Sequence, residues 1–240
     1  MSELSRPILP GSAATDYERY LRTDELLALQ KRDSEVVHHD EHLFQAVHQA
    51  SELWLKFASG EVDAAARLVT ADQPAAAVRL LRRANDAMQI LLDQLRMLEH
   101  MNPVDYAVVR TALGHGAGFD SPGFRSVHQV SPLAGAAFDA LLARRGVGLL
   151  DVYRGGGAHE DVYQLAEQLL TWDERNILWR TLHLKVVERI IGGHVVGTQG
   201  TPVEVLGRRL DVRFFPTLWE VRDEITRQSP LGADGHGGQL

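Results

Sequence analysis

The sequence predicts an all-α fold, and three observations favour it. Apolar residues recur at steps of three and four through most of the chain, which is the period of a helix with one buried face. Only residues 195–200 (VVGTQG) and 209–215 (RLDVRFF) have weak strand character. With 240 residues and 45% apolar content, the chain is long enough to bury a sizeable core. We therefore expect a helical bundle.

The N-terminal half begins with an arm and two helical segments. Residues 1–15 contain two prolines and no sustained period, so we expect a flexible arm. Residues 16–29 predict a short helix with Thr15 or Asp16 near its start. Residues 38–57 predict a longer helix with two adjoining apolar stripes. One stripe holds Leu43, Val47, Ala50, Trp54 and Phe57, and the other holds Phe44, His48, Ser51 and Leu55.

Later helices alternate with clear breakers. Residues 113–124 contain four glycines and a proline, which predicts a loop with unusual backbone freedom. The pair Gly192 and Gly193 ends the longest late helix. The expected helices are residues 74–98, a helix through Tyr106 and Arg110, helices resuming near Pro132 and near Glu160, residues 173–191, and a closing helix with Pro216 in its first turn. We assign residues 16–228 to one helical domain and residues 229–240 to a flexible tail.

Composition excludes several classes of function. The formal charge of −7 and the pI near 5.9 are unfavourable for binding nucleic acid or an anionic membrane. The absence of cysteine excludes disulfides, zinc-thiolate sites, thiolate-ligated heme and cysteine nucleophiles. No apolar run reaches the length of a membrane span, and the N-terminus has no basic region followed by an apolar run. These features predict a cytoplasmic protein.

Two histidines lie on apolar helical stripes. His183 shares a face with Trp179, Val187 and Ile190, which suits an imidazole that ligates a buried iron, although a lone histidine in such a position is more often a core residue. His48 follows Phe44 by one turn, so the pair presents an apolar ring beside a hydrogen-bonding ring. That arrangement suits an aromatic ligand that carries an N–H.

Other polar residues admit two interpretations each. Arg110 precedes the glycine-rich loop, where it either grips a carboxylate through two hydrogen bonds or forms a surface ion pair. Residues 38–42 (HHDEH) offer metal-ligand chemistry, but adjacent residues rarely converge on one ion, and Asp40 and Glu41 are interpreted as acids at a helix start. The GTQG sequence lacks the lysine and the preceding strand of a phosphate-binding loop.

Ordered blocks along nearly the whole chain resemble the tryptophan 2,3-dioxygenase family. They are YERYLRTDELLALQ (17–30), HDEHLFQAVHQASELWLK (39–56), AGFDS (117–121) after Arg110, LLDVYR (149–154), LWRTLHLKVVERIIG (178–192), GTQG (197–200) and FFPTLWEVR (214–222). The resemblance implies a homotetramer of helical subunits, each binding one heme b, with O2 as co-substrate. It further implies oxygenation of tryptophan to N-formylkynurenine, the first reaction of tryptophan catabolism in the kynurenine pathway.

The resemblance also implies roles for individual residues. His183 corresponds to the axial ligand of the heme iron, and His48 to the catalytic distal histidine that faces the indole N–H. Arg110 corresponds to the arginine that binds the substrate carboxylate. The remaining positions are Phe44 and Tyr106 in the substrate pocket, Thr198 at the amino-acid head group, Tyr17, Tyr20 and Leu21 in a neighbouring subunit's pocket, and Trp179, Ala117 and Gly118 beside the heme.

Three departures from the family pattern leave alternatives open. Ala117 replaces a serine, Asp120 replaces a glutamine, and the loop reads GTQGTPV, where Gln199 and Pro202 are expected to stiffen a segment that closes over substrate. The chain is also shorter than typical members. A related heme monooxygenase that forms a 2-oxindole or hydroxylated product is therefore an alternative, and a non-catalytic heme sensor is a third. A carboxylate-binding arginine is of no use to a gas sensor, which favours an enzyme.

Overall fold

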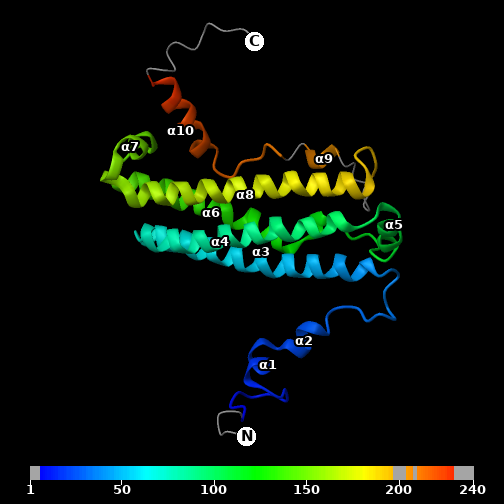
Figure 1. Ribbon diagram of the computed structural model, residues 1–240. Coiled ribbons are helices and arrows are strands. Elements are labelled where there is room, and N and C mark those ends of the chain that lie inside the picture. Colours follow the sequence, from blue (N-terminus) through cyan, green and yellow to red (C-terminus); the bar gives the residue numbers. More distant parts are fainter. Residues whose placement is uncertain (1–5, 197–203, 208–209, 230–240) are drawn as a thin grey trace.

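Four long helices form the centre of the computed structural model, which describes residues 6–196, 204–207 and 210–229 (Figure 1). They are α3 (Asp40–Thr70), α4 (Pro74–Leu95), α6 (Pro122–Arg145) and α8 (Glu160–Ile191). Helix α3 packs along both α4 and α6, and α4 packs along α8. The described residues contain no extended strand, and residues 210–215 form a turn and a loop. The predicted all-α class is confirmed.

Short helices connect and flank the bundle. They are α1 (Asp16–Leu21), α2 (Thr23–Leu27), α5 (Pro103–Thr111), α7 (Leu149–Arg154), α9 (Glu204–Gly207) and α10 (Pro216–Arg227), with 3-10 turns at Arg96–His100, Gly118–Asp120 and Gly156–His159. In α5, the Asn102 side chain accepts a hydrogen bond from the N–H of Val104 at 2.9 Å, next to a proline in the first turn. Within the described part of the chain, no helix has the length and apolarity needed to cross a membrane.

The structure corrects four helix boundaries. The helix expected at residues 38–57 continues to Thr70. The helix expected at residues 16–29 is two short helices, because Arg22 adopts a left-handed φ of 55° between them. Helix α6 starts at Pro122 and continues through Pro132, so packing along α3 outweighs the roughly 3 kcal/mol that an interior proline costs. The two late helices expected from Glu160 and from Asp173 are one continuous helix, α8.

The core consists of two apolar clusters. The larger one fills the middle of the bundle around Leu55, Leu91, Leu141 and Trp172, each fully buried, and each such side chain contributes about 1.5–3 kcal/mol of stability. The indole N–H of Trp172 donates to Ser131 Oγ at 2.9 Å, which satisfies the one polar atom of that ring. The smaller cluster lies where α3 begins and α8 ends, and it consists of Val47, Leu95, Leu98, Met101, Val109, Val186 and Ile190.

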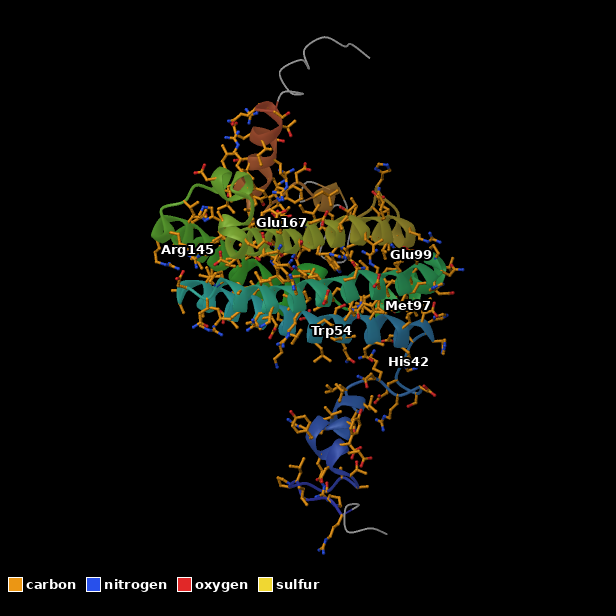
Figure 2. The ribbon with its side chains drawn as sticks, turned by 60° about the vertical axis from the view of Figure 1, so that its left-hand side comes forward. His42, Trp54, Met97, Glu99, Arg145 and Glu167 are labelled. Atoms are coloured by element: carbon orange, nitrogen blue, oxygen red, sulfur yellow. The ribbon has the colours of Figure 1, made fainter. Side chains whose placement is uncertain are left out.

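The N-terminal segment leaves the bundle at the start of α3. Residues 29–37 are held there, because Lys31 pairs with Glu41 and the backbone N–H of Lys31 donates to Gln45 Oε1 at 2.9 Å. Helices α1 and α2 lie beyond this contact, well away from the four long helices (Figure 1). Figure 2 shows His42 where the segment joins the bundle, with Met97 and Glu99 at the same end and Arg145 at the opposite end.

Candidate functional site

Phe44 and His48 lie one turn apart on α3 and stack on each other, with ring centroids 4.0 Å apart and an interplanar angle of 28°. His48 Nδ1 is 2.7 Å from the carbonyl oxygen of Phe44. Because a carbonyl oxygen only accepts, Nδ1 carries the proton and Nε2 keeps its lone pair in the neutral ring. His48 therefore presents a hydrogen-bond acceptor to a ligand.

Protein surrounds the His48 ring on part of its surface. Its side chain is exposed to solvent, yet burial by the surrounding protein lowers its pKa below 6.5, against smaller raising effects of the Phe44 hydrogen bond and the Glu52 charge. Water reaches one side of the ring and protein surrounds the others, which accounts for both the solvent exposure and the lowered pKa of His48. His48 is therefore mostly neutral at pH 7.

His183 faces the same region from α8. Its ring stacks on Trp179 at a centroid distance of 4.8 Å and an interplanar angle of 9°. Burial, and then the charge of His48, lower the pKa of His183 to about 4, so the imidazole is neutral at pH 7. No side chain or backbone group among residues 6–196, 204–207 and 210–229 hydrogen-bonds to this ring. A neutral imidazole with a ring nitrogen that makes no hydrogen bond has the chemistry to ligate a metal ion.

Aromatic side chains surround the two histidines. Tyr106, on α5, lies with its ring centroid 5.9 Å from that of Phe44, and burial raises its pKa above 10. Phe124, at the start of α6, lies 4.1 Å from the ring centroid of Trp179. Helices α3, α5, α6 and α8 thus each contribute an aromatic ring. Phe44, Tyr106 and Trp179 border the smaller apolar cluster, and Phe124 borders the larger one. The faces of these four rings, which we call the aromatic cluster, suit contact with a flat, largely apolar ligand.

Arg110 lies one turn after Tyr106 on α5, near enough for its charge to affect the pKa of the tyrosine. Its guanidinium donates from Nη2 to the carbonyl oxygen of Val196 at 2.9 Å, where the segment after α8 passes. It forms no ion pair with a carboxylate in the described part of the chain, so it differs from an ordinary surface ion pair. Thr198, also predicted at this site, lies outside the described residues.

The turn at Ala117 and Gly118 precedes α6. The carboxylate of Asp120 accepts a hydrogen bond from the N–H of Ala117 at 3.0 Å, so the charge that departs from the family pattern closes this turn on itself. Glu52, which the sequence analysis did not identify, accepts from Ser121 Oγ at 2.5 Å and from the N–H of Gly123 at 2.9 Å. Its position one turn after His48 on α3 is the sequence signal that could have identified it.

Two groups of predicted residues lie apart from these rings. Tyr17, Tyr20 and Leu21 are exposed on α1, and the structure does not bring them to their own chain's aromatic cluster. In the 38–42 segment, Asp40 and Glu41 occupy the first turn of α3, and Glu41 accepts from Lys31 and from the N–H of Val37 at 2.9 Å. In the described ranges, no group of three or more histidine or acidic side chains is placed to hold a metal ion.

Sequence comparisons show which known proteins this chain is similar to. A sequence profile described as tryptophan 2,3-dioxygenase matches residues 4–131. The tryptophan 2,3-dioxygenase of Myxococcus xanthus strain DK1622 is 32% identical over 281 positions, which cover 94% of this chain and 96% of the relative. The Bacillus anthracis tryptophan 2,3-dioxygenase is 31% identical over 282 positions, covering 94% and 100%, and that of Polaromonas sp. strain JS666 is 34% identical over 268 positions, covering 90% of each.

These alignments run over more positions than this chain has residues, so the relatives carry segments that the chain lacks. The similarity nevertheless covers nearly the whole chain, so it includes both α3, which carries His48, and α8, which carries His183. The chain belongs to the tryptophan 2,3-dioxygenase family.

Proposed function

We propose that this protein is a heme-dependent oxygenase that inserts both atoms of O2 into the indole ring of L-tryptophan to give N-formylkynurenine. The observation that carries the proposal is a pair of neutral histidines beside the same aromatic rings, one on α3 and one on α8. The ring of His48 hydrogen-bonds to the Phe44 carbonyl, and the ring of His183 makes no hydrogen bond in the described part of the chain. His183 has a free ring nitrogen for iron, and His48 has an acceptor nitrogen for an indole N–H.

The residues around the two histidines fit a heme group. His183 is neutral, which is the form that would hold the heme iron, and its ring packs on Trp179. The aromatic rings of Phe44, Tyr106 and Phe124 supply apolar surface for the macrocycle and the substrate. When bound through His183, heme would supply the O2-binding and redox chemistry of the reaction, with Ala117 and Gly118 in the turn beside it.

The protein's own residues then position the substrate. Arg110 would bind the carboxylate of the amino acid, and Thr198 its head group. Phe44 would pack on the indole plane, and Nε2 of His48 would accept a hydrogen bond from the indole N–H. Holding the substrate at both ends fixes the reacting carbon and removes much of the entropic barrier. One tryptophan and one O2 balance one N-formylkynurenine, so the overall reaction consumes no further reductant.

We further propose that the protein works as a cytoplasmic homotetramer. Helices α1 and α2 expose apolar side chains, among them Tyr17, Tyr20 and Leu27, on a segment that extends away from its own bundle. A neighbouring subunit would cover these side chains, and Tyr17, Tyr20 and Leu21 would then complete that subunit's pocket. The predicted division into an arm, one catalytic domain at residues 16–228 and a tail belongs to this proposal.

One experiment separates the candidate functions. The purified protein is examined for heme by its absorption spectrum, then reduced and incubated aerobically with L-tryptophan, and the product is analysed by mass spectrometry. A product with two added oxygen atoms is expected. One added atom would instead identify a monooxygenase, an alternative that the replacement of a pocket serine by Ala117 favours. Intact heme without any product would identify a sensor, and a folded protein that takes up no heme would refute the proposal.

A further inference from the structure

The carboxylate of Glu52 connects the helix that carries His48 to the turn that precedes α6. Glu52 and His48 lie four residues apart on α3 and therefore share a face of that helix. One oxygen of Glu52 accepts from Ser121 Oγ at 2.5 Å, and the other accepts from the N–H of Gly123 at 2.9 Å. Hydrogen bonds to an ionised acceptor are about twice as strong as neutral ones.

The contact depends on close packing between α3 and α6. A Cβ atom added at Gly123 would lie 2.6 Å from Leu55 Cβ and 2.7 Å from Glu52 Oε2, distances that real Cβ atoms do not reach. Ser121 serves both partners, since its hydroxyl donates to Glu52 and accepts from the N–H of Phe124 at 3.1 Å. The start of α6 is therefore fixed on α3 beside the histidine.

The turn before α6 is closed by its own bonds. The N–H of Ala117 donates to the Asp120 carboxylate at 3.0 Å, and the N–H of Asp120 donates to the carbonyl oxygen of Ala117 at 2.9 Å. The Arg125 guanidinium also donates to the Asp120 carbonyl oxygen, at 3.2 Å. On the α3 side, the Glu52 carboxylate bonds to the end of this turn at Ser121 and to the first turn of α6 at Gly123. Glu52 thus links the turn to the helix that carries His48.

We propose that Glu52 is a positioning residue that holds the turn of residues 117–121 at a fixed place relative to His48, and thereby sets the distance between this turn and the His48 ring. The inference rests on the proposed function only for its activity measurement. The anchoring itself is a property of the folded chain and is measurable without substrate.

The first test compares Glu52→Gln with Glu61→Gln, a matched change on the same helix whose carboxylate faces Arg83 on α4 instead. The glutamine amide is neutral and has a single acceptor oxygen, so the bond from the Gly123 N–H is either lost or becomes a weaker neutral bond. We expect the Gly123 amide to exchange with solvent at least about tenfold faster in Glu52→Gln, as loss of a charge-assisted bond predicts, and to be unchanged in Glu61→Gln. Unchanged exchange in Glu52→Gln would overturn the anchoring.

The second test measures turnover per bound heme. Arg110 and its contact with Val196 lie outside the anchored turn, so we expect KM for tryptophan to stay within about twofold while kcat falls about tenfold in Glu52→Gln. Glu61→Gln should keep both parameters. Faster Gly123 exchange with normal kcat would show that the bond only joins two helices and would overturn the positioning role.

Ser121→Ala provides a second route to the same result. It removes the Ser121 bond to Glu52, together with the bond that the Phe124 N–H donates to Ser121, without changing α3, and we expect the same direction of change in exchange and kcat. The double variant Glu52→Gln with Ser121→Ala should be less severe than the two single effects combined, because both act through one contact. Independent, fully additive effects would contradict the proposal. A wild-type protein without heme would refute the proposed function, while amide exchange would still decide the anchoring.

Discussion

His183 and His48 are both neutral at pH 7 and lie beside the same aromatic rings, but they differ in hydrogen bonding, which indicates different roles. His48 Nδ1 is committed to the Phe44 carbonyl, whereas the His183 ring has no hydrogen bond within the described ranges. We expect His183→Ala to fold but to take up no heme, because the imidazole proposed to hold the iron is removed. His48→Ala should keep heme, as judged by the Soret band of each purified variant at equal helicity by circular dichroism. A normal heme spectrum in His183→Ala would rule out the ligand assignment.

The Arg110 guanidinium donates to a backbone carbonyl, and no carboxylate within residues 6–196, 204–207 and 210–229 pairs with it. A substrate carboxylate would form charge-assisted bonds with it, each contributing about 1.5–3 kcal/mol. We expect Arg110→Ala to keep its heme and to raise KM for tryptophan by about 10- to 100-fold. Steady-state kinetics normalised to heme content measure this effect.

Tryptamine, which lacks the carboxylate, provides the control for Arg110. Tryptamine turnover should be slow in the wild-type protein and no slower in Arg110→Ala. Tryptamine has no carboxylate for Arg110 to bind, so removing the guanidinium removes no bond to this substrate. Arg110→Lys should restore only part of the affinity for tryptophan, since a lysine cannot form two parallel bonds. An equal loss with both substrates would show that Arg110 maintains the fold of the site and does not bind the carboxylate.

At the level of elements, a buried carboxylate attaches the C-terminal segment to α8. Asp173 is fully buried and accepts from the N–H groups of Phe214 at 3.0 Å and Phe215 at 3.1 Å, and from the indole N–H of Trp219 at 3.0 Å. Asp173→Ala would leave these donors without partners, at about 1–3 kcal/mol each. We expect urea unfolding to show a loss of at least about 3 kcal/mol. Glu174→Ala, at the adjacent exposed position, should change stability by less than about 0.5 kcal/mol.

A second element-level contact is sensitive to pH. The hydrogen bond from Lys31, and then that from the N–H of Val37, lower the pKa of Glu41 below 4.5. The folded state therefore holds fewer protons on this group than the unfolded state, so the contact stabilises above pH 4.5 and is lost as pH falls through the lower folded pKa. We expect the Val37 amide to lose protection at acid pH. Glu41→Gln should lower its protection already at pH 7, and equal protection in both proteins would exclude this link.

Helical period was sufficient to predict the class and most elements, because each helix buries one continuous stripe. Boundaries that depend on distant packing were not predictable in the same way. Pro132 signals a break locally, but the α3 face against which α6 packs is more than 60 residues away in the chain. The sequence predicts a helix start at Asp173, whereas the structure places Asp173 inside α8. Its three hydrogen-bond donors lie beyond residue 213, so the local pattern does not indicate its structural role. Glu52 was missed for the same reason, because its partners follow about 70 residues later.

For the whole molecule, the exposed N-terminal segment is the feature that a single subunit does not explain. Tyr17 and Tyr20 are 69% and 78% exposed, although tyrosine rings gain stability when buried. Residues 29–37 are fixed to α3 by Lys31 and its neighbours, so the direction in which α1 and α2 leave the bundle is defined. A covering subunit on that side would bury these rings and place them at its own aromatic cluster.

Complementation between subunits tests whether the segment acts on a neighbour. A Tyr17→Ala, Tyr20→Ala double variant and Arg110→Ala are each expected to have low activity as homo-oligomers. In mixed oligomers, a subunit with intact Arg110 would receive an intact segment from its Arg110→Ala partner, so part of the wild-type turnover should return. If the segment served only its own subunit, every site would keep one defect, and mixing would restore nothing. Co-expression with two affinity tags, isolation of the mixed species and kinetics per heme distinguish these outcomes, because only a segment acting across the subunit boundary allows recovery.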